Sequence, residues 1–344
     1  MFGLTRIGLV SVASGVAALL SAPAQSEQFS FAGKQVKIAI GYGVGGTYGK
    51  YSQMFADHLK DHIPGNPTIT VDSRPGAGGM RMTNYAAKAM PADGYNYIVP
   101  PDTSVLVQLM QPGKAKYDMR EFTWIGTANQ TNTIVVVRSD TGVKTWEELR
   151  DKEVPMAAAG LGSTGYIIPK LVNGVLGTKI KVVSGYKGSS KAGLSVEQGE
   201  TRGASYNWLF WRSKYERWFQ GNDPYARALI QVGYFRDPDV PESVPMLKEV
   251  VKPEDKSLVE FVGALGLIGR GLAAPPGTPK AAIAVMRTAW NKMITDPKFI
   301  SDAARRKLRV TPVAGDKVQQ VVNDTINNTK PGLIKRTRQI VYGN

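Results

Sequence analysis

Residues 36–46 have the sequence Val-Lys-Ile-Ala-Ile-Gly-Tyr-Gly-Val-Gly-Gly, which joins an apolar run directly to a glycine-rich turn. The run 36–40 has the length and the β-branched residues of a buried strand. A helical pattern follows from about Gly49 to His62, and Pro64-Gly65 ends it. Because a strand that passes through such a turn into a helix is the building unit of α/β proteins, this stretch predicts a parallel sheet.

The same pattern recurs immediately downstream. A second strand is expected at 68–71, and the glycine-rich turn RPGAGG at 74–79 follows it. The helix expected at 80–90 then leads to the strand entry DGYNYIV at 93–99. This βαβαβ order predicts a doubly wound sheet.

Three apolar runs in the middle of the chain predict the strands of a second α/β unit: 134–137, 154–159 and 180–183. The second run leads into GLGSTG at 160–165 and the third into GYKGSS at 185–190, and a helical pattern follows each turn. The chain therefore has two α/β units, each with two glycine-rich turns between a strand and a helix.

A third segment near the C-terminus completes the expected fold. GLAAPPGTP at 271–279 predicts an extended segment and a turn, and a helix begins there at Thr278-Pro279. Its apolar residues fall on one face, which we expect to lie in the core. They are Ile283, Met286, Trp290, Met293 and Ile294.

The composition excludes most catalytic chemistry. The 344 residues include no Cys and two His, so thiol nucleophiles, disulfides and Cys-ligated metals are ruled out. His58 and His62 lie four residues apart, but the glutamate of an HExxH motif is missing and no third ligand is evident. Ser163 lies in GLGSTG rather than GxSxG, and no histidine is placed to act as its base. We therefore expect no enzyme activity, catalytic residue, cofactor or metal.

The formal charge of +15 raises the question of nucleic-acid binding. Residues 298–344 contain ten Lys and Arg against three Asp, so about half of the charge lies in this C-terminal segment. Its basic residues alternate with apolar ones, as on the exposed face of surface helices, and no base-stacking aromatic motif accompanies them. We expect a solvated surface and no nucleic-acid partner.

The first 24 residues have the features of a cleaved export signal. Arg6 precedes an apolar run at 7–20, and Ala22-Pro23-Ala24 has the small-x-small pattern of a signal-peptidase site. The run is shorter than the roughly 20 residues that a spanning helix needs. We expect residues 1–24 to be removed on export to the periplasm.

Two of the turns match the GxGxxG pattern of dinucleotide-binding proteins: Gly41, Gly43, Gly46 and Gly160, Gly162, Gly165. The strand after the first match ends in Val71-Asp72, where such proteins place the acid that binds the ribose. A Rossmann-type oxidoreductase is therefore the alternative interpretation. Export argues against it, since nicotinamide cofactors are mainly cytosolic, and no acid ends the strand after the second match.

A single interpretation covers all four glycine-rich turns. Such turns expose backbone N–H groups at helix N-termini, where the helix dipole favours a carboxylate or another oxyanion. In open α/β sheets these turns gather at the carboxyl ends of the strands, around the ligand-binding crevice. Two turns from each unit therefore predict a two-lobed cleft, to which hydroxyl side chains add donors and acceptors. They are Thr47, Ser163, Thr164, Ser189 and Ser190.

Six motifs in this order resemble the substrate-binding receptors of tripartite tricarboxylate transporters, the Bug family. They are the Gly45-Gly46 turn, RPGAGG at 74–79, PADGYNYIV at 91–99, GLGSTG at 160–165, GYKGSS at 185–190 and GLAAPPGTP at 271–279. The resemblance spans nearly the whole chain after the export signal. It implies a type II periplasmic binding fold that closes on a small organic carboxylate and delivers it to a membrane permease without catalysis.

The resemblance also implies lobe boundaries and binding residues. The first lobe would comprise residues 26–128 and 253–344, and the second residues 129–252, in a protein expected to be a monomer. The implied ligand-binding residues are Gly45, Gly46, Thr47, Gly76, Ala77, Gly78, Gly79, Gly162, Ser163 and Thr164.

Two departures from the family pattern bear on the ligand. Gly49 stands where many members have Asp, and Gly199-Glu200-Thr201-Arg202 replaces Gly-x-Val-Asp. If Arg202 points into the cleft, it favours a di- or tricarboxylate; the alternative is an exposed surface arginine. Downstream, Tyr206 and Asn207 are candidates to reach the cleft. Trp208 and Trp211 would either stack on an aromatic acid or pack in the core.

Overall fold

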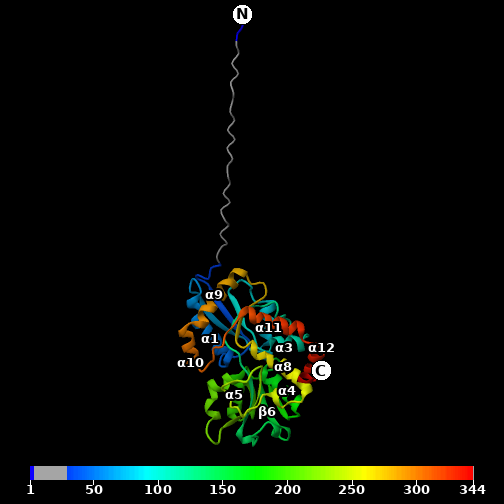
Figure 1. Ribbon diagram of the computed structural model, residues 1–344. Helices are drawn as coiled ribbons and strands as arrows, with labels where there is room; N and C mark the ends of the chain where they lie inside the picture. The colour runs from blue at the N-terminus through cyan, green and yellow to red at the C-terminus, as the bar shows by residue number, and fades with distance from the viewer. Residues whose placement is uncertain (4–28, 344) are drawn as a thin grey trace.

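The structure is a computed structural model that describes residues 1–3 and 29–343. The expected export signal lies, apart from residues 1–3, outside the described residues. Two α/β units are stacked on one another, as Figure 1 shows. The blue, cyan, orange and red parts of the chain form the upper unit, and the green and yellow middle forms the lower one.

A six-stranded sheet forms the first unit, in the order β11-β4-β10-β3-β1-β2. Its strands are β1 (Gln35–Ile40), β2 (Thr68–Ser73), β3 (Asn96–Val99), β4 (Thr123–Thr127), β10 (Gly271–Ala274) and β11 (Val313–Ala314). β1 is parallel to β2 and β3, which confirms the predicted parallel arrangement of the first three strands. β10 is antiparallel to β3 and β4, so the extended segment of GLAAPPGTP returns to complete the first sheet.

Helices cover both faces of this sheet. They are α1 (Thr47–Leu59), α2 (Met80–Lys88), α3 (Ser104–Met110), α9 (Lys280–Thr295), α10 (Pro297–Arg305) and α11 (Gly315–Asn328). The apolar face predicted for α9 is buried, from 0% exposure at Met286 and Met293 to 8% at Ile283. On that face Trp290 meets Phe55 of α1, with 4.8 Å between the ring centroids.

A five-stranded sheet forms the second unit, in the order β7-β6-β8-β5-β9. Its strands are β5 (Thr133–Arg138), β6 (Val154–Ala158), β7 (Ile180–Ser184), β8 (Gly203–Asn207) and β9 (Ala226–Val232). The three strands predicted in this region are present. The pattern missed β8, because its sequence Gly-Ala-Ser-Tyr-Asn has no apolar run, although all five residues are buried.

The helices of the second unit are α4 (Thr164–Leu176), α5 (Ser189–Gln198), α6 (Trp208–Tyr215), α7 (Leu247–Val250) and α8 (Lys256–Gly263). The 3₁₀ turns of the chain lie at Lys60–His62, Ala77–Gly79, Ser139–Thr141, Glu147–Arg150, Glu216–Phe219, Pro253–Asp255 and Ala264–Leu267. No helix in residues 29–343 is long and apolar enough to cross a membrane.

Two neighbouring chain segments connect the units. Thr131 N–H donates to the Gly266 carbonyl at 3.2 Å, and Ala128 N–H donates to the Arg270 carbonyl at 3.1 Å. The two crossings are therefore hydrogen-bonded to each other.

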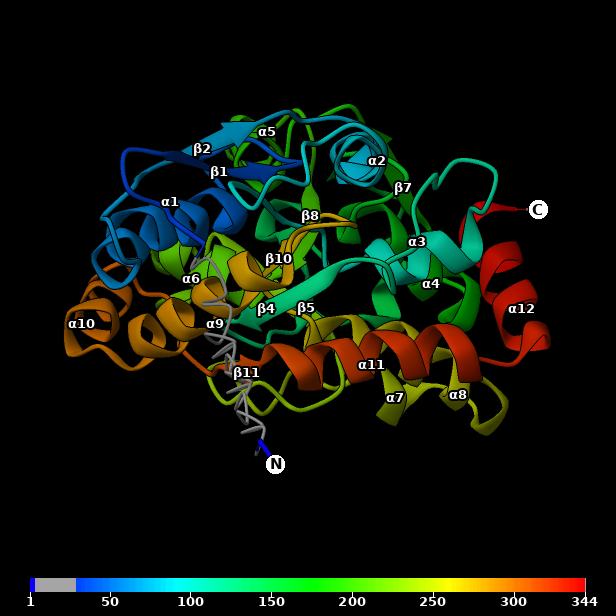
Figure 2. The same ribbon diagram turned by 90° about the horizontal axis from the view of Figure 1, so that it is seen from above.

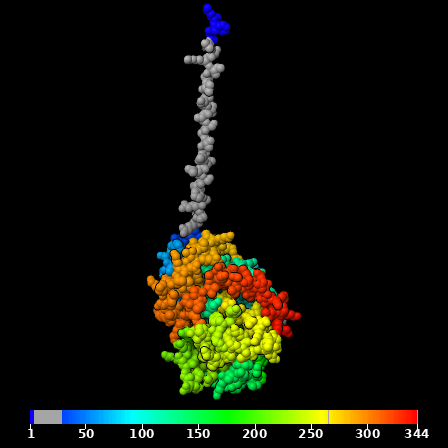
Figure 3. Space-filling model, in the orientation of Figure 1, coloured from blue at the N-terminus to red at the C-terminus, as the bar shows by residue number. Residues whose placement is uncertain are grey.

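The C-terminal helix α12 (Pro331–Tyr342) reaches the second unit. It contacts α4 as well as α3, and the Tyr342 hydroxyl donates to the Leu161 carbonyl at 3.1 Å. Figures 2 and 3 show this red end of the chain beside the second unit. The expected divisions after residues 128 and 252 therefore stay a prediction: α12 contacts both units, and α8, which follows residue 252, contacts α7 and β9 of the second unit.

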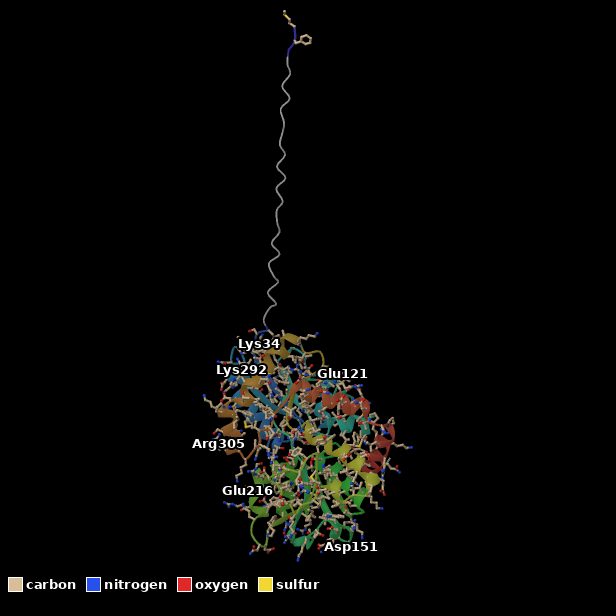
Figure 4. All side chains as sticks on the ribbon, viewed as in Figure 1. Lys34, Glu121, Asp151, Glu216, Lys292 and Arg305 are labelled. Atoms are coloured by element: carbon tan, nitrogen blue, oxygen red, sulfur yellow. The ribbon has the colours of Figure 1, made fainter. Side chains whose placement is uncertain are left out.

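Ion pairs also link the units at the edge where Figure 4 labels Arg305 and Glu216. Lys307 pairs with Glu216, and Arg309 Nη2 lies 2.7 Å from Asp237 Oδ1, which is fully buried. Both basic residues follow α10 in the first unit, whereas both acids belong to the second. The described contacts therefore hold the units together at this edge as well as at the crossings.

Asp302 on α10 docks that helix onto α1. Its carboxylate lies 3.0 Å from His58 Nε2 and 2.8 Å from Arg306 Nη2, and Arg305 also pairs with it. Burial acts to raise the pKa of Asp302, but hydrogen bonds from Arg305, Arg306 and His58 outweigh it and hold the pKa well below its usual value. The ionised carboxylate thus stabilises the folded state.

We expect Asp302→Asn to lower the free energy of unfolding by about 1–3 kcal/mol at pH 7, because three charge-assisted contacts are weakened. A lowered pKa contributes stability above the unfolded value near 3.9, and this contribution is lost as the pH falls below it. The difference between the two proteins should therefore shrink from about pH 5 to pH 2 in urea denaturation.

Asp140→Asn is the matched control, because Asp140 pairs with Arg138 and Arg202 while 45% of its side chain is exposed. Its effect should stay below about 0.5 kcal/mol. Equal effects of the two substitutions, or a difference that persists unchanged to pH 2, would contradict the role given to Asp302.

Candidate functional site

The glycine-rich turns of the two units touch each other. Gly43 N–H donates to the Lys187 carbonyl at 2.8 Å across the units. A Cβ atom at Gly46 would lie 2.6 Å from Ser189 Oγ, and one at Gly45 would lie 2.8 Å from Ser190 Oγ. Glycine at these positions therefore lets the first turn of one unit contact the last turn of the other.

RPGAGG and GLGSTG make a second contact of this kind, backbone against backbone. Gly78 has φ +67°, and a Cβ atom there would lie 2.5 Å from the Ser163 amide nitrogen. A Cβ atom at Gly162 would lie 3.0 Å from the Ala77 carbonyl oxygen. Beside them the Thr103 hydroxyl donates to the Gly162 carbonyl at 2.5 Å. Side chains are excluded here by direct contact between the units.

These contacts enclose a cavity of about 20 Å³, which has room for about one water molecule. Residues of both units line it: Tyr42, Gly43, Gly46, Thr47, Tyr48, Asp102, Thr164, Ser189, Tyr206, Asn207 and Arg270. A larger molecule therefore does not fit the cavity in this arrangement of the units.

Four helices begin at this cavity. Thr47 is the first residue of α1, Thr164 of α4 and Ser189 of α5, and Asn207 is the N-cap of α6. The first unit thus contributes one of these helix starts, that of α1, and the second unit contributes the other three. Backbone N–H groups and helix dipoles at such ends favour a negative charge.

The cation of the site is Arg270, which sequence reasoning missed, as it missed its partner Asp102. Its side chain is 2% exposed and pairs with Asp102, with Nη1 2.9 Å from Oδ2. The guanidinium carbon lies 3.9 Å from the centroid of the Tyr48 ring. Arg270 precedes β10 directly, so only the return of that strand to the first sheet places it here. The motif GLAAPPGTP marked the neighbouring residues, but nothing in the sequence distinguishes this arginine from exposed ones.

Thr47 joins the two units through its hydroxyl oxygen. That oxygen receives hydrogen bonds from Arg270 Nε at 3.3 Å and Nη2 at 3.1 Å, and from Asn207 Nδ2 at 3.1 Å. Asn207 also caps α6, since its Oδ1 accepts from Phe210 N–H at 2.9 Å. Three donors from two chain segments therefore converge on one oxygen, the arrangement that a ligand oxygen would also meet.

The tyrosines around the cavity stay protonated. Burial raises the pKa of Tyr42, Tyr48 and Tyr206 well above the ordinary value. The Tyr42 hydroxyl donates to the Gly78 carbonyl at 2.7 Å, and the Tyr48 hydroxyl accepts from Asp102 N–H at 2.7 Å. They supply neutral hydrogen-bonding groups rather than negative charge.

Of the predicted binding residues, Gly46, Thr47, Thr164 and Asn207 line the cavity. The remaining glycines lie in the contacting turns around it: Gly45, Gly76, Gly78, Gly79 and Gly162, with Ala77 among them. The Ser163 hydroxyl is turned toward its own loop and donates to the Gly160 carbonyl at 2.8 Å.

Arg202 does not reach the cavity. It precedes β8, whereas Asn207 ends that strand, so the two are separated by about 16 Å of extended chain. Its Nη1 lies 3.3 Å from Asp140 Oδ2, and 42% of the side chain is exposed. The geometry therefore does not support a role of Arg202 in ligand binding. It supports the alternative interpretation, in which Arg202 is an exposed surface arginine.

The departure at Gly49 has a steric reason. A Cβ atom there would lie 1.9 Å from the Val44 carbonyl oxygen, so the first turn of α1 lies directly against the glycine-rich loop. No aspartate side chain fits at this position.

The other candidates have structural roles. Trp208 Nε1 donates to the Asp239 carbonyl, and Trp211 is fully buried in an aromatic cluster with Phe210 and Tyr215. These two tryptophans therefore pack in the second unit.

The two histidines do not face each other as metal ligands. His58 pairs with Asp302, and His62 Nε2 lies 3.1 Å from Asp296 Oδ2. Among the described residues no group of three or more acidic or histidine side chains is placed to hold a metal.

The first turn contacts the second unit where a dinucleotide-binding turn would contact a pyrophosphate. Gly43 N–H is bonded to Lys187, and Gly45 and Gly46 face the serines of the second unit. Asp72, the candidate ribose ligand, pairs with Arg74 at 2.8 Å. The geometry therefore favours the two-lobed receptor over the Rossmann alternative.

A larger cavity, of about 830 Å³, lies elsewhere in the second unit. All of its lining residues fall between Lys144 and Val250, among them Trp208 and Arg212. No glycine-rich turn contributes to it, so it is separate from the site between the units.

Comparisons with known proteins agree with this geometry. The model of the tripartite tricarboxylate transporter family receptor matches residues 54–338. A UPF0065 protein of Bordetella pertussis is 21% identical over 323 residues, covering 91% of this chain and 93% of that protein.

Two solved structures share the fold. The periplasmic binding protein BugD has 18% identity and a TM-score of 0.69, with 89% of this chain and 97% of that chain covered. MatC from Rhodopseudomonas palustris, solved with bound malate, has 18% identity and a TM-score of 0.68, with 89% and 98% covered. The expected two-lobed α/β fold of periplasmic binding proteins is thereby confirmed.

The contact between the units predicts a cross-link. A Cβ atom at position 46 would lie 3.9 Å from Ser189 Cβ, within the range of disulfides. We expect Gly46→Cys with Ser189→Cys to form an intramolecular disulfide under mild oxidation, since the chain has no other cysteine. Mass spectrometry after alkylation checks it. Each single substitution is the control and should keep one free thiol; two free thiols in the double variant would argue against the closed contact in solution.

Proposed function

The chain belongs to the tripartite tricarboxylate transporter receptor family, and on this premise we propose that it captures a small organic carboxylate between its two units and presents it to a membrane permease. The proposal rests above all on one observation, the cavity where four helix starts and Arg270 converge. A ligand carboxylate would there exchange its water shell for fixed backbone and side-chain donors.

The ligand class has support from chemistry and from a relative. Each helix dipole favours a nearby negative charge by about 0.3–1 kcal/mol, and charge-assisted hydrogen bonds add more. MatC, which shares this fold, was solved with malate bound. A carboxylate is thus the ligand for which the site is best suited.

Closure couples binding to recognition by the permease. In the open form the turns of the two units are apart, and the ligand has access to Thr47 and Arg270. In the closed form Gly78 meets Ser163, and Gly43 meets Lys187 over the ligand. Because the ligand bonds to both units only when they are closed, it shifts the population toward that form, which the permease would recognise.

We propose binding without turnover. The described cavity residues include no histidine or lysine, and its tyrosines are held protonated by burial. Asp102, the one carboxylate, is paired with Arg270. The site therefore lacks a free base to activate water or substrate. We further propose that the protein acts as a monomer in the periplasm.

Gly78→Ala should weaken carboxylate binding at least about tenfold, because the added Cβ meets the Ser163 amide and holds the units apart. Titration calorimetry with acetate, succinate, malate, citrate and benzoate measures it. If the unmodified protein shows no binding of any of the five acids, the proposed ligand class is wrong.

Gly177→Ala is the matched control for this substitution. Gly177 has φ +70°, close to that of Gly78, but a Cβ atom there meets nothing within 4 Å. Both substitutions should cost about 1–2 kcal/mol in backbone strain, and only the one at Gly78 should change binding. Equal affinities of the two variants would count against closure through the 76–79 turn.

Export predicts the N-terminus of the mature protein. When the full chain is produced in a Gram-negative host, we expect the periplasmic fraction to contain a chain that begins at Gln25. Intact-mass measurement identifies this end. A substitution of Ala24 by a bulky residue such as Phe should block the cleavage, and a periplasmic protein that retains Met1 would contradict the assignment.

A further inference from the structure

Arg270 and Asp102 are held rigidly in the wall of the cavity between the units. Their side chains are 2% and 8% exposed, and Tyr48 covers the guanidinium face. Arg270 N–H also donates to Asn129 Oδ1 at 3.0 Å, which fixes the backbone from which the side chain extends. The positions of the two charges are therefore set before a ligand arrives.

These are the only charged side chains that line the cavity in the described part of the chain. Their charges balance, so one ligand carboxylate finds Arg270 and the helix starts as its partners. A second carboxylate next to the first finds no second cation and lies close to Asp102. Repulsion between like charges is strong in such a poorly hydrated environment.

The hydrogen-bonding capacity of the pair is also incompletely used. Arg270 donates from Nε to Thr47, from Nη1 to Asp102 and Gly269, and once from Nη2 to Thr47. Since a guanidinium has five N–H groups, one on Nη2 remains for a ligand oxygen. The carboxylate of Asp102 accepts from Arg270 and has the Tyr48 hydroxyl as its other hydrogen-bonding neighbour, which leaves lone pairs on its two oxygens for a ligand donor. A donor and an acceptor for the ligand thus lie side by side.

We propose that the Arg270–Asp102 pair selects a compact monocarboxylate with a hydrogen-bond donor, hydroxyl or ammonium, next to the carboxylate, and disfavours a dicarboxylate. The carboxylate binds Arg270 and the helix starts, and the donor binds Asp102. This inference rests on the proposed function and names its ligand class. It replaces the di- or tricarboxylate that an inward Arg202 would have favoured, since Arg202 lies at the far end of β8.

Four ligands of nearly equal size test the proposal by titration calorimetry on the mature protein: propionate, lactate, alanine and malonate. Lactate and alanine add a hydroxyl or an ammonium to propionate, and malonate replaces its methyl group by a carboxylate. We expect lactate or alanine to bind at least about tenfold more tightly than propionate, and malonate to bind more weakly than either. Which of the two binds more tightly identifies the donor.

Asp102→Asn keeps the shape of the side chain and removes its charge. In this variant lactate and alanine should bind no more tightly than propionate. The ratio of their affinities to that of malonate should fall at least about tenfold. Arg202→Gln, at the exposed ion pair with Asp140, is the control and should leave all four affinities unchanged. Circular dichroism establishes that each variant is folded; if Asp102→Asn is not, the four affinities of the unmodified protein decide alone.

The outcomes separate the two levels of the proposal. If malonate binds as tightly as lactate and alanine, or if propionate has the same affinity as both, the proposed selectivity is wrong. The proposed capture of a carboxylate would not be affected by that result. Absence of binding by all four ligands, and by succinate, malate, citrate and benzoate as well, would overturn both.

Discussion

The backbone contact between residues 76–79 and 160–163 sets the geometry of the cleft. Gly78 and Gly162 approach so closely that a single Cβ atom on either would push the neighbouring backbone away. The second of these turns directly precedes α4, whose first residue, Thr164, lines the cavity. The close approach of the two glycine-rich turns thus brings a helix start of the second unit to the site, where it favours an anion.

Inside that contact lies a buried ion pair, which is costly unless its charges are matched and hydrogen-bonded. Asp102 balances the charge of Arg270, Tyr48 covers it, and the Thr47 hydroxyl accepts two of its N–H groups. Asn207 of the second unit reaches the same hydroxyl. The first unit and the crossings thus hold the arginine in place, and Asn207 adds a contact from the second unit through the same Thr47 hydroxyl.

The path of the chain makes this linkage possible. The strand β10, which follows the second crossing, enters the first sheet antiparallel to β3 and β4. Arg270 stands at the start of that strand, next to the crossing itself, and its carbonyl accepts from Ala128 on the other crossing. A charged group placed next to the crossings lies between the units, whereas Arg202, in the turn before β8, pairs with Asp140 at the exposed surface.

The sequence by itself determined the two α/β units and the four glycine-rich turns, because strand, turn and helix patterns are local and repeat within about 30 residues. It also placed Thr47, Thr164 and Asn207 near the cleft. Only the tertiary structure decided which arginine belongs to the site. Arg202 and Arg270 look alike as sequence, and β8, whose five residues are buried without an apolar run, carries no local signal. Burial, and the pairing of residues more than 150 positions apart, arise from the path of the chain between the units rather than from neighbouring residues.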